Sequence, residues 1–113
     1  MKKNMKLALN DIGGEVVKDN DTYFLKDNNT LKNLVLSSTL LNPFKQTTGH
    51  THSGQEEVYF FVSGSGKMLL NDETFEVEEG DVVLIPDGAF HRVINDTAEP
   101  FYFVCVFDGK RSH

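Results

Sequence analysis

A chain of 113 residues that is 39% hydrophobic and 25% charged is large enough for one globular domain and too small for two. Its formal net charge of −6 and its lack of a basic cluster make nucleic acid and anionic membranes poor partners. The single cysteine, Cys105, excludes an internal disulfide and fits a reducing compartment. No apolar run approaches a membrane span, and the basic N-terminus lacks the apolar stretch of a signal peptide, so we expect a cytoplasmic protein.

Short strand-like runs separated by turn residues follow one another along most of the chain. The first 30 residues carry the weakest signals, with edge strands predicted at residues 16–17 and 23–25 and a turn at residues 27–29. The stronger strands are predicted at residues 34–41, 57–62, 67–70, 74–77, 82–85, 90–94 and 101–107. Short strands at this spacing, with Gly, Pro, Asn and Asp between them, predict an all-β sandwich or barrel with little helix.

Two of the predicted strands are apolar on both faces. A strand with one face in water alternates apolar and polar residues. Residues 58–62 (Val-Tyr-Phe-Phe-Val) and residues 101–107 (Phe-Tyr-Phe-Val-Cys-Val-Phe) do not alternate in this way. Either the N-terminal segment or a second subunit must cover the outer face, and we expect a homodimer because so short a chain has little other material for the task.

Two histidines, His50 and His52, lie two residues apart in a turn-rich segment. On a strand they would leave the same face with Cα atoms about 6.6 Å apart, which lets both imidazoles lean onto one metal ion. A turn at residues 53–55 would bring a carboxylate on the next strand to the same ion. The residues alone leave Glu56 and Glu57 as alternatives for that carboxylate.

A second segment, residues 80–95, places His91 at the start of a strand, directly after a turn that contains Pro86 and Gly88. A single histidine in such a place is more often structural than a metal ligand. The fourth histidine, His113, is the last residue of the chain and is expected to be disordered.

Taken together, the two segments resemble the two characteristic motifs of the cupin superfamily. The first motif (H-x-H, then E, then G, at the family's spacings) is matched by His50, His52, Glu57 and Gly64. The second motif (G, P-x-G, H and N) is matched at every position, by Gly80, Pro86, Gly88, His91 and Asn95. One departure is Phe44, which stands where the first motif opens with a glycine and therefore alters a turn before the ligands.

The resemblance implies a fold and a set of metal ligands. The fold would be a double-stranded β-helix, a jelly-roll-like cupin barrel, in one domain over residues 1–113. Residues 34–107 would form the barrel that bears the motifs, and residues 1–30 would form N-terminal strands or an arm. The spacing to Gly64 singles out Glu57 rather than Glu56. The implied ligands of a divalent metal ion are His50, His52, Glu57 and His91.

Three imidazole nitrogens and one carboxylate oxygen suit Fe, Mn, Co, Ni, Cu or Zn as the divalent ion. Four protein ligands would also leave positions open for a small-molecule ligand or substrate. Tyr59 and Phe61 share the strand face of Glu57, and Cys105 lies in the last predicted strand, so these three are candidate pocket residues. The sequence assigns no catalytic residue.

The function that the resemblance implies is broad. We expect a metal-dependent enzyme, dioxygenase-like or related, that acts on a small polar substrate able to chelate the ion. A metal-dependent isomerase or lyase is an alternative. A non-catalytic module for a small carboxylate or sugar is another alternative, because the sequence offers few candidates for an acid or base near the metal. These candidates are Tyr59, Cys105 and residues 37–39 (Ser-Ser-Thr), whose facing the sequence leaves open.

Overall fold

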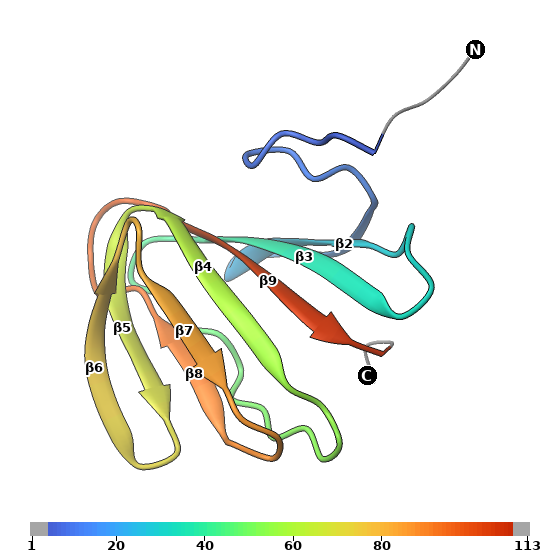
Figure 1. Cartoon of the computed structure of the whole chain (residues 1–113). Coiled ribbons are helices and arrows are strands. Elements are labelled where there is room, and N and C mark those ends of the chain that lie inside the picture. The colour runs from blue at the N-terminus through green and yellow to red at the C-terminus, as the bar shows by residue number, and fades with distance from the viewer. Residues whose placement is uncertain (1–4, 110–113) are drawn as a thin grey trace.

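The computed structural model describes residues 5–109 and folds them into two antiparallel β-sheets with no helix among them (Figure 1). The strands are β1 (Glu15–Asp19), β2 (Tyr23–Asn28), β3 (Leu34–Leu41), β4 (Glu57–Ser63), β5 (Ser65–Leu70), β6 (Glu73–Glu78), β7 (Val82–Ile85), β8 (His91–Ile94) and β9 (Phe101–Asp108). One sheet has the order β1-β2-β3-β9-β4-β7, and the other has the order β6-β5-β8. This architecture confirms the predicted all-β class. Over the same residues, no helix meets the length and apolarity needed to cross a membrane.

Two predictions about the N-terminal strands are wrong. β2 is not an edge strand, because it lies between β1 and β3 in the larger sheet. It also continues through Asn28, where the composition predicts a turn. Asp27 is paired with Ser37 of β3, and its side chain is buried. Pairing with the long strand β3 therefore outweighs the turn preference of these polar residues.

The inner face of the larger sheet carries an aromatic core next to the smaller sheet. Phe61, Phe101 and Phe103 are nearly fully buried, with ring centroids 5.1 to 5.8 Å apart. Met68 of β5 and Val93 of β8 belong to the same buried cluster. Burial of side chains of this size contributes about 1.5–3 kcal/mol each, so this core fixes the two sheets against each other.

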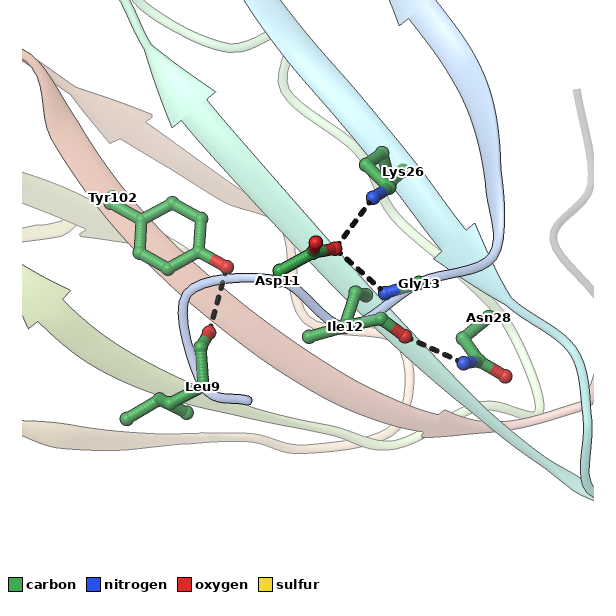
Figure 2. A network of polar contacts seen from close by, with 7 residues as sticks. All are labelled: Leu9, Asp11, Ile12, Gly13, Lys26, Asn28 and Tyr102. Carbon is green, nitrogen blue, oxygen red and sulfur yellow. Dashed lines mark hydrogen bonds and ion pairs between the residues drawn. The ribbon is translucent and has the colours of Figure 1, made fainter. Parts of the chain in front are cut away.

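The outer face of the larger sheet is partly covered by residues 5–14, here called the N-terminal segment. Figure 2 shows how the segment is held, by a hydrogen bond from Tyr102 Oη to Leu9 O (2.8 Å), a hydrogen bond from Asn28 Nδ2 to Ile12 O (2.7 Å) and an ion pair between Lys26 and Asp11 (3.0 Å). The side chain of Ile12 is only 2% exposed. The chain itself therefore covers the part of this face that lies over β2 and β9.

Candidate metal centre

Glu57 and His91 meet inside the barrel because each is the first residue of an inward-facing strand. Glu57 begins β4 in the larger sheet, and His91 begins β8 in the smaller one. Glu57 Oε1 lies 3.1 Å from His91 Nε2, and both side chains are buried. The two motifs, far apart in the sequence, thus supply one carboxylate and one imidazole to the same point.

The loop before β4 brings the other two histidines to this point. The backbones of His50 and His91 exchange two hydrogen bonds, of 3.0 and 3.1 Å, and Gly88 N donates to His52 O at 3.0 Å. The ring centroid of His52 lies 5.4 Å from that of His50 and 6.0 Å from that of His91. The loop is therefore fixed by backbone contacts to the turn and strand that carry His91.

Gly49 allows this loop to approach so closely. A Cβ atom at Gly49 would lie 2.0 Å from the ring of Phe90, which precedes His91. Any other residue would force either the Phe90 ring or the loop to move. The glycine directly before the first histidine therefore has a steric reason in this structure.

Three residues offer ligand atoms close enough for one ion. The ligand atoms of His52, Glu57 and His91 all lie within 4.8 Å of one another. Two imidazole nitrogens and one carboxylate oxygen form a borderline donor set that fits a divalent transition metal. His50 is exposed and is not part of this group of three, although its ring lies beside that of His52. Its role as a fourth ligand stays a prediction.

The surroundings of His91 orient its ring and change its protonation. Because a carbonyl oxygen only accepts, His91 Nδ1 donates to Ala89 O (3.1 Å), and Nε2 faces Glu57. Burial alone would lower the pKa of His91, but the hydrogen bond to Glu57, the Ala89 carbonyl and the Glu57 charge outweigh it and raise the pKa above the ordinary 6.5. A ring held through Nδ1 presents Nε2 to a metal, as metal-binding histidines commonly do. A proton and a metal ion therefore compete for the same nitrogen.

A cavity of about 50 Å³ adjoins these residues. Besides the three histidines and Glu57, it is lined by Tyr23, Leu25, Ser37, Thr39, Thr47, Tyr59, Phe103 and Cys105. Five of these eight side chains carry a hydroxyl group, and none of the lining residues is Lys or Arg. The cavity therefore offers neutral hydrogen-bonding groups beside the candidate metal ligands.

The structure separates the three candidate pocket residues. Tyr59 and Cys105 line the cavity, and Tyr59 meets the His91 ring edge-on with centroids 5.8 Å apart. Phe61 lies one row further along β4, stacked on Phe101 in the aromatic core, and is not among the cavity-lining residues. His113 lies outside the described residues.

One buried polar row crosses the inner face of the larger sheet beside the cavity. Asp27 is paired with Ser37, Ser37 with Cys105, and Cys105 with Tyr59, each on the next strand. All four side chains are buried. Side chains directly opposite one another have Cβ atoms about 4.5–5.5 Å apart, so the row is continuous from β2 to the cavity.

Sequence reasoning missed several of the lining residues. Tyr23 and Leu25 lie in the N-terminal part of the chain that was expected to form edge strands, and Thr47 and Phe103 carry no motif signal. The alternation of β2, in which Tyr23, Leu25 and Asp27 are buried, is the signal that could have found two of them. It indicates a strand with one buried face, placed inside the sheet.

Phe44, the departure from the first motif, keeps the backbone conformation that a glycine would favour. Its φ angle is +59°, in the left-handed region, and its side chain is 69% exposed. Phe44 N donates to Thr97 O at 3.2 Å, which holds the turn in place. Phe44 therefore adopts a left-handed backbone conformation of the kind that glycine takes without steric cost.

Comparisons with known proteins agree with these motifs. A model of the cupin domain matches residues 39–107. Over 102 residues the chain is 28% identical to an uncharacterized protein of Methanocaldococcus jannaschii, covering 80% of this chain and 82% of that protein. Over 117 residues it is 32% identical to a glucose-6-phosphate isomerase of Pyrococcus abyssi, covering 88% of this chain and 62% of that protein. The chain spans 42–62% of the length of the glucose-6-phosphate isomerases that it matches.

A solved structure supports the fold. The structure of an uncharacterized protein from Klebsiella pneumoniae with a double-stranded β-helix domain superposes with a TM-score of 0.82 at 17% identity, over 98% of this chain and 95% of that one. This similarity confirms the predicted double-stranded β-helix and concerns the fold alone. Because the family model covers more than half of the sequence, the chain belongs to the cupin domain family.

Proposed function

We propose that this chain is a metal-dependent isomerase of a small hydroxy-carbonyl compound such as a sugar or a sugar phosphate. The observation that carries the proposal is the cavity wall, where hydroxyl groups of Ser37, Thr39 and Tyr59 lie beside the candidate metal ligands. Hydroxyl groups donate and accept hydrogen bonds, which suits a substrate rich in hydroxyl groups. Relatives named glucose-6-phosphate isomerase support the same reaction class.

The divalent ion would be held by His50, His52, Glu57 and His91. When bound, it supplies Lewis acidity to a substrate carbonyl oxygen. The ring of His50 lies beside that of His52, and its side chain is exposed, so His50 would complete the ligand set from the mouth of the cavity. This donor set suits Fe, Mn, Co, Ni, Cu or Zn.

The size of the cavity sets how a substrate would bind. At about 50 Å³ the cavity is narrow for a six-carbon compound. Only its chelating end would enter, where Ser37 and Thr39 can hydrogen-bond to it. The rest would stay at the mouth near His50. Because no Lys or Arg lines the cavity, a phosphate group would also stay outside.

An aldose–ketose isomerisation moves one proton between two adjacent carbon atoms and another between the oxygen atoms on those carbons. Apart from the four proposed metal ligands, the titratable side chains that line the cavity are Tyr23, Tyr59 and Cys105. Of these three, Tyr59 is the one whose ring contacts His91, which places it next to the proposed metal ligands. We therefore assign it the role of proton carrier in this proposal.

Deuterium exchange under argon tests the reaction class. Protein loaded with each of the six metals is incubated in D₂O with aldose and ketose phosphates, and products are followed by NMR. The proposal expects interconversion with deuterium at the carbon next to the carbonyl. Thr51→Ala, an exposed residue between two histidines, should keep the activity, and His52→Ala should lose it.

The predicted dioxygenase-like enzyme is the second candidate, because so small a cavity suits a diatomic ligand beside the chelating end of a substrate. Substrate-dependent oxygen uptake without anaerobic exchange would favour it over the isomerase. Saturable binding of a sugar or carboxylate with neither reaction would favour the non-catalytic module.

Three predictions about the setting of this protein accompany the proposal. They are a single domain over residues 1–113, a cytoplasmic location and the lack of nucleic-acid or membrane partners. The net charge of −6 supports the last of these, because an acidic protein is repelled by anionic surfaces.

A further inference from the structure

Asp27 is a buried carboxylic acid that the proposed mechanism does not use. Its side chain is 5% exposed and lies on the same inward face of β2 as Leu25, which lines the cavity. The residue opposite Asp27 on β3 is Ser37, which is fully buried and also lines the cavity. Side chains paired in this way have Cβ atoms about 4.5–5.5 Å apart. The Asp27 carboxylate therefore lies directly behind a hydroxyl group of the cavity wall.

The hydrogen bond made by Ser37 decides what its hydroxyl group offers to a ligand. Ser37 Oγ lies 3.2 Å from Lys26 O, and because a carbonyl oxygen only accepts, the Ser37 hydroxyl is the donor. A serine hydroxyl has one proton and two acceptor lone pairs. The proton of Ser37 is directed to the backbone of β2, so toward the cavity this hydroxyl acts as an acceptor.

The charge behind Ser37 acts in the same direction. A carboxylate also offers only acceptor oxygens. Lys26, the cation next to Asp27 in the strand, points to the opposite face of β2, where its Nζ pairs with Asp11 at 3.0 Å. No Lys or Arg lines the cavity. This side of the cavity therefore favours ligand groups that donate a proton and repels oxygen atoms that carry negative charge.

We propose that Ser37, backed by Asp27, determines the specificity of the cavity by accepting a hydrogen bond from a ligand hydroxyl group. The pair thereby selects hydroxy-carbonyl compounds over keto acids of the same size. This proposal rests on the proposed function, because it takes the ligand to be a small hydroxy-carbonyl compound held at the candidate metal centre. It also gives a reason for burying a charged group beside the cavity, since burial of a charge costs free energy.

Binding of three matched compounds to the zinc-loaded protein tests the proposal. Hydroxyacetone, pyruvate and butanedione all carry an acetyl group, which is joined to a hydroxymethyl group, a carboxylate and a second acetyl group, respectively. Zinc has no redox chemistry, so ligand-observed NMR can measure each dissociation constant without a reaction with oxygen. Ser37→Ala should weaken the binding of hydroxyacetone about 5-fold, the usual effect of one hydrogen bond, and leave the binding of butanedione unchanged.

Asp27→Asn tests the charge through a gain of binding, which a misfolded variant would not show. The variant should bind pyruvate about 10-fold more tightly, because a negative charge near the ligand carboxylate is removed, and should bind butanedione as before. Ser38→Ala is the matched control. Ser38 is the next residue of β3, is also buried and points to the opposite face, so its replacement should change none of the three affinities.

Three results would overturn the proposal. They are an unchanged affinity for hydroxyacetone in Ser37→Ala, an unchanged affinity for pyruvate in Asp27→Asn, and a zinc-loaded unaltered protein that binds none of the compounds. The first two would leave the isomerase reaction standing, because deuterium exchange measures that reaction separately. The absence of deuterium exchange, together with the expected pattern of binding, would remove the isomerase and leave the specificity of Ser37 and Asp27 in place.

Discussion

The two faces of the six-stranded sheet are built from alternate residues of the same strands, yet they differ in chemistry. On β4, Glu57 and Tyr59 point inward to the cavity, whereas Val58 and Phe60 point outward. The inner face mixes carboxylate, hydroxyl and thiol groups with an aromatic core. The outer face is apolar over β4 and β7 and partly in water there, whereas over β2 and β9 it carries the polar groups of Lys26, Asn28 and Tyr102 that hold the N-terminal segment.

This difference explains why these strands do not alternate in hydrophobicity. A strand that faces water on one side would carry polar residues there. Here the polar residues lie inside, around the candidate metal centre, and the outward positions carry apolar residues that need cover. The polar side chains of the inner face thus surround the candidate metal centre, and the apolar side chains of the outer face remain partly in water.

The largest difference between the two faces should appear in kcat when one hydroxyl group is removed from the inner face or added to the outer face of β4. If Tyr59 carries a proton, Tyr59→Phe should lower kcat about 10²–10⁴-fold, the usual range for loss of a general acid or base. Phe60→Tyr adds a hydroxyl to the neighbouring outward position and should leave kcat unchanged. Steady-state kinetics and thermal unfolding of both variants check this. A Tyr59→Phe variant with full activity would remove Tyr59 from the mechanism.

The buried pair on the inner face should make the stability of the metal-free protein depend on pH. The pKa of His91 is raised in the folded protein, so its contribution is fully present below about pH 6.5 and is lost as pH rises through the folded-state pKa. In chelator, lowering the pH from 8.5 to 6 should therefore raise the melting temperature of the unaltered protein relative to Glu57→Gln. Calorimetry of the two proteins measures the difference.

With metal bound, the pH dependence should reverse, because a proton and the ion compete for His91 Nε2. Metal affinity should fall as pH is lowered through the same range. In the metal-free proteins, a melting-temperature advantage of the unaltered protein over Glu57→Gln that shrinks toward acid pH would contradict the raised pKa of His91.

Phe44 belongs to neither face and should show the smallest effect. Its φ of +59° is strained for a residue with a side chain, so Phe44→Gly should stabilise the fold by about 1 kcal/mol. Denaturant unfolding measures the change, with Phe44→Ala as a control that keeps the strain. If Phe44→Gly is no more stable than Phe44→Ala, the turn carries no strain energy.

Much of the barrel could be predicted because its signals are local. Turn residues bound each strand from residue 34 onward, and the spacing of both motifs points to Glu57 and His91, which the structure brings within 3.1 Å. β2 was harder, because Asp27 and Asn28 have turn-forming composition and are held in the strand by pairing with β3. The same non-local pairing decides that Ser37 and Thr39 face the cavity.

The placement of His50 shows the same limit. Two histidines two residues apart would share one face of a strand, but here the loop is not a strand and only His52 joins the close group of three. The path of this loop is set by its backbone hydrogen bonds to β8 and by the close approach of Phe90 to Gly49. The spacing of the histidines in the sequence predicts neither contact.

Metal analysis tests the central claim most directly. The protein is purified without added metal, equilibrated with each divalent ion, separated from free ion and measured by elemental mass spectrometry. We expect one tightly bound ion per chain in the unaltered protein and in Thr51→Ala, and at least 100-fold weaker binding in His52→Ala and His91→Ala. An unaltered protein that binds no divalent ion, or a His91→Ala variant that binds as tightly, would contradict the metal centre described for this cupin.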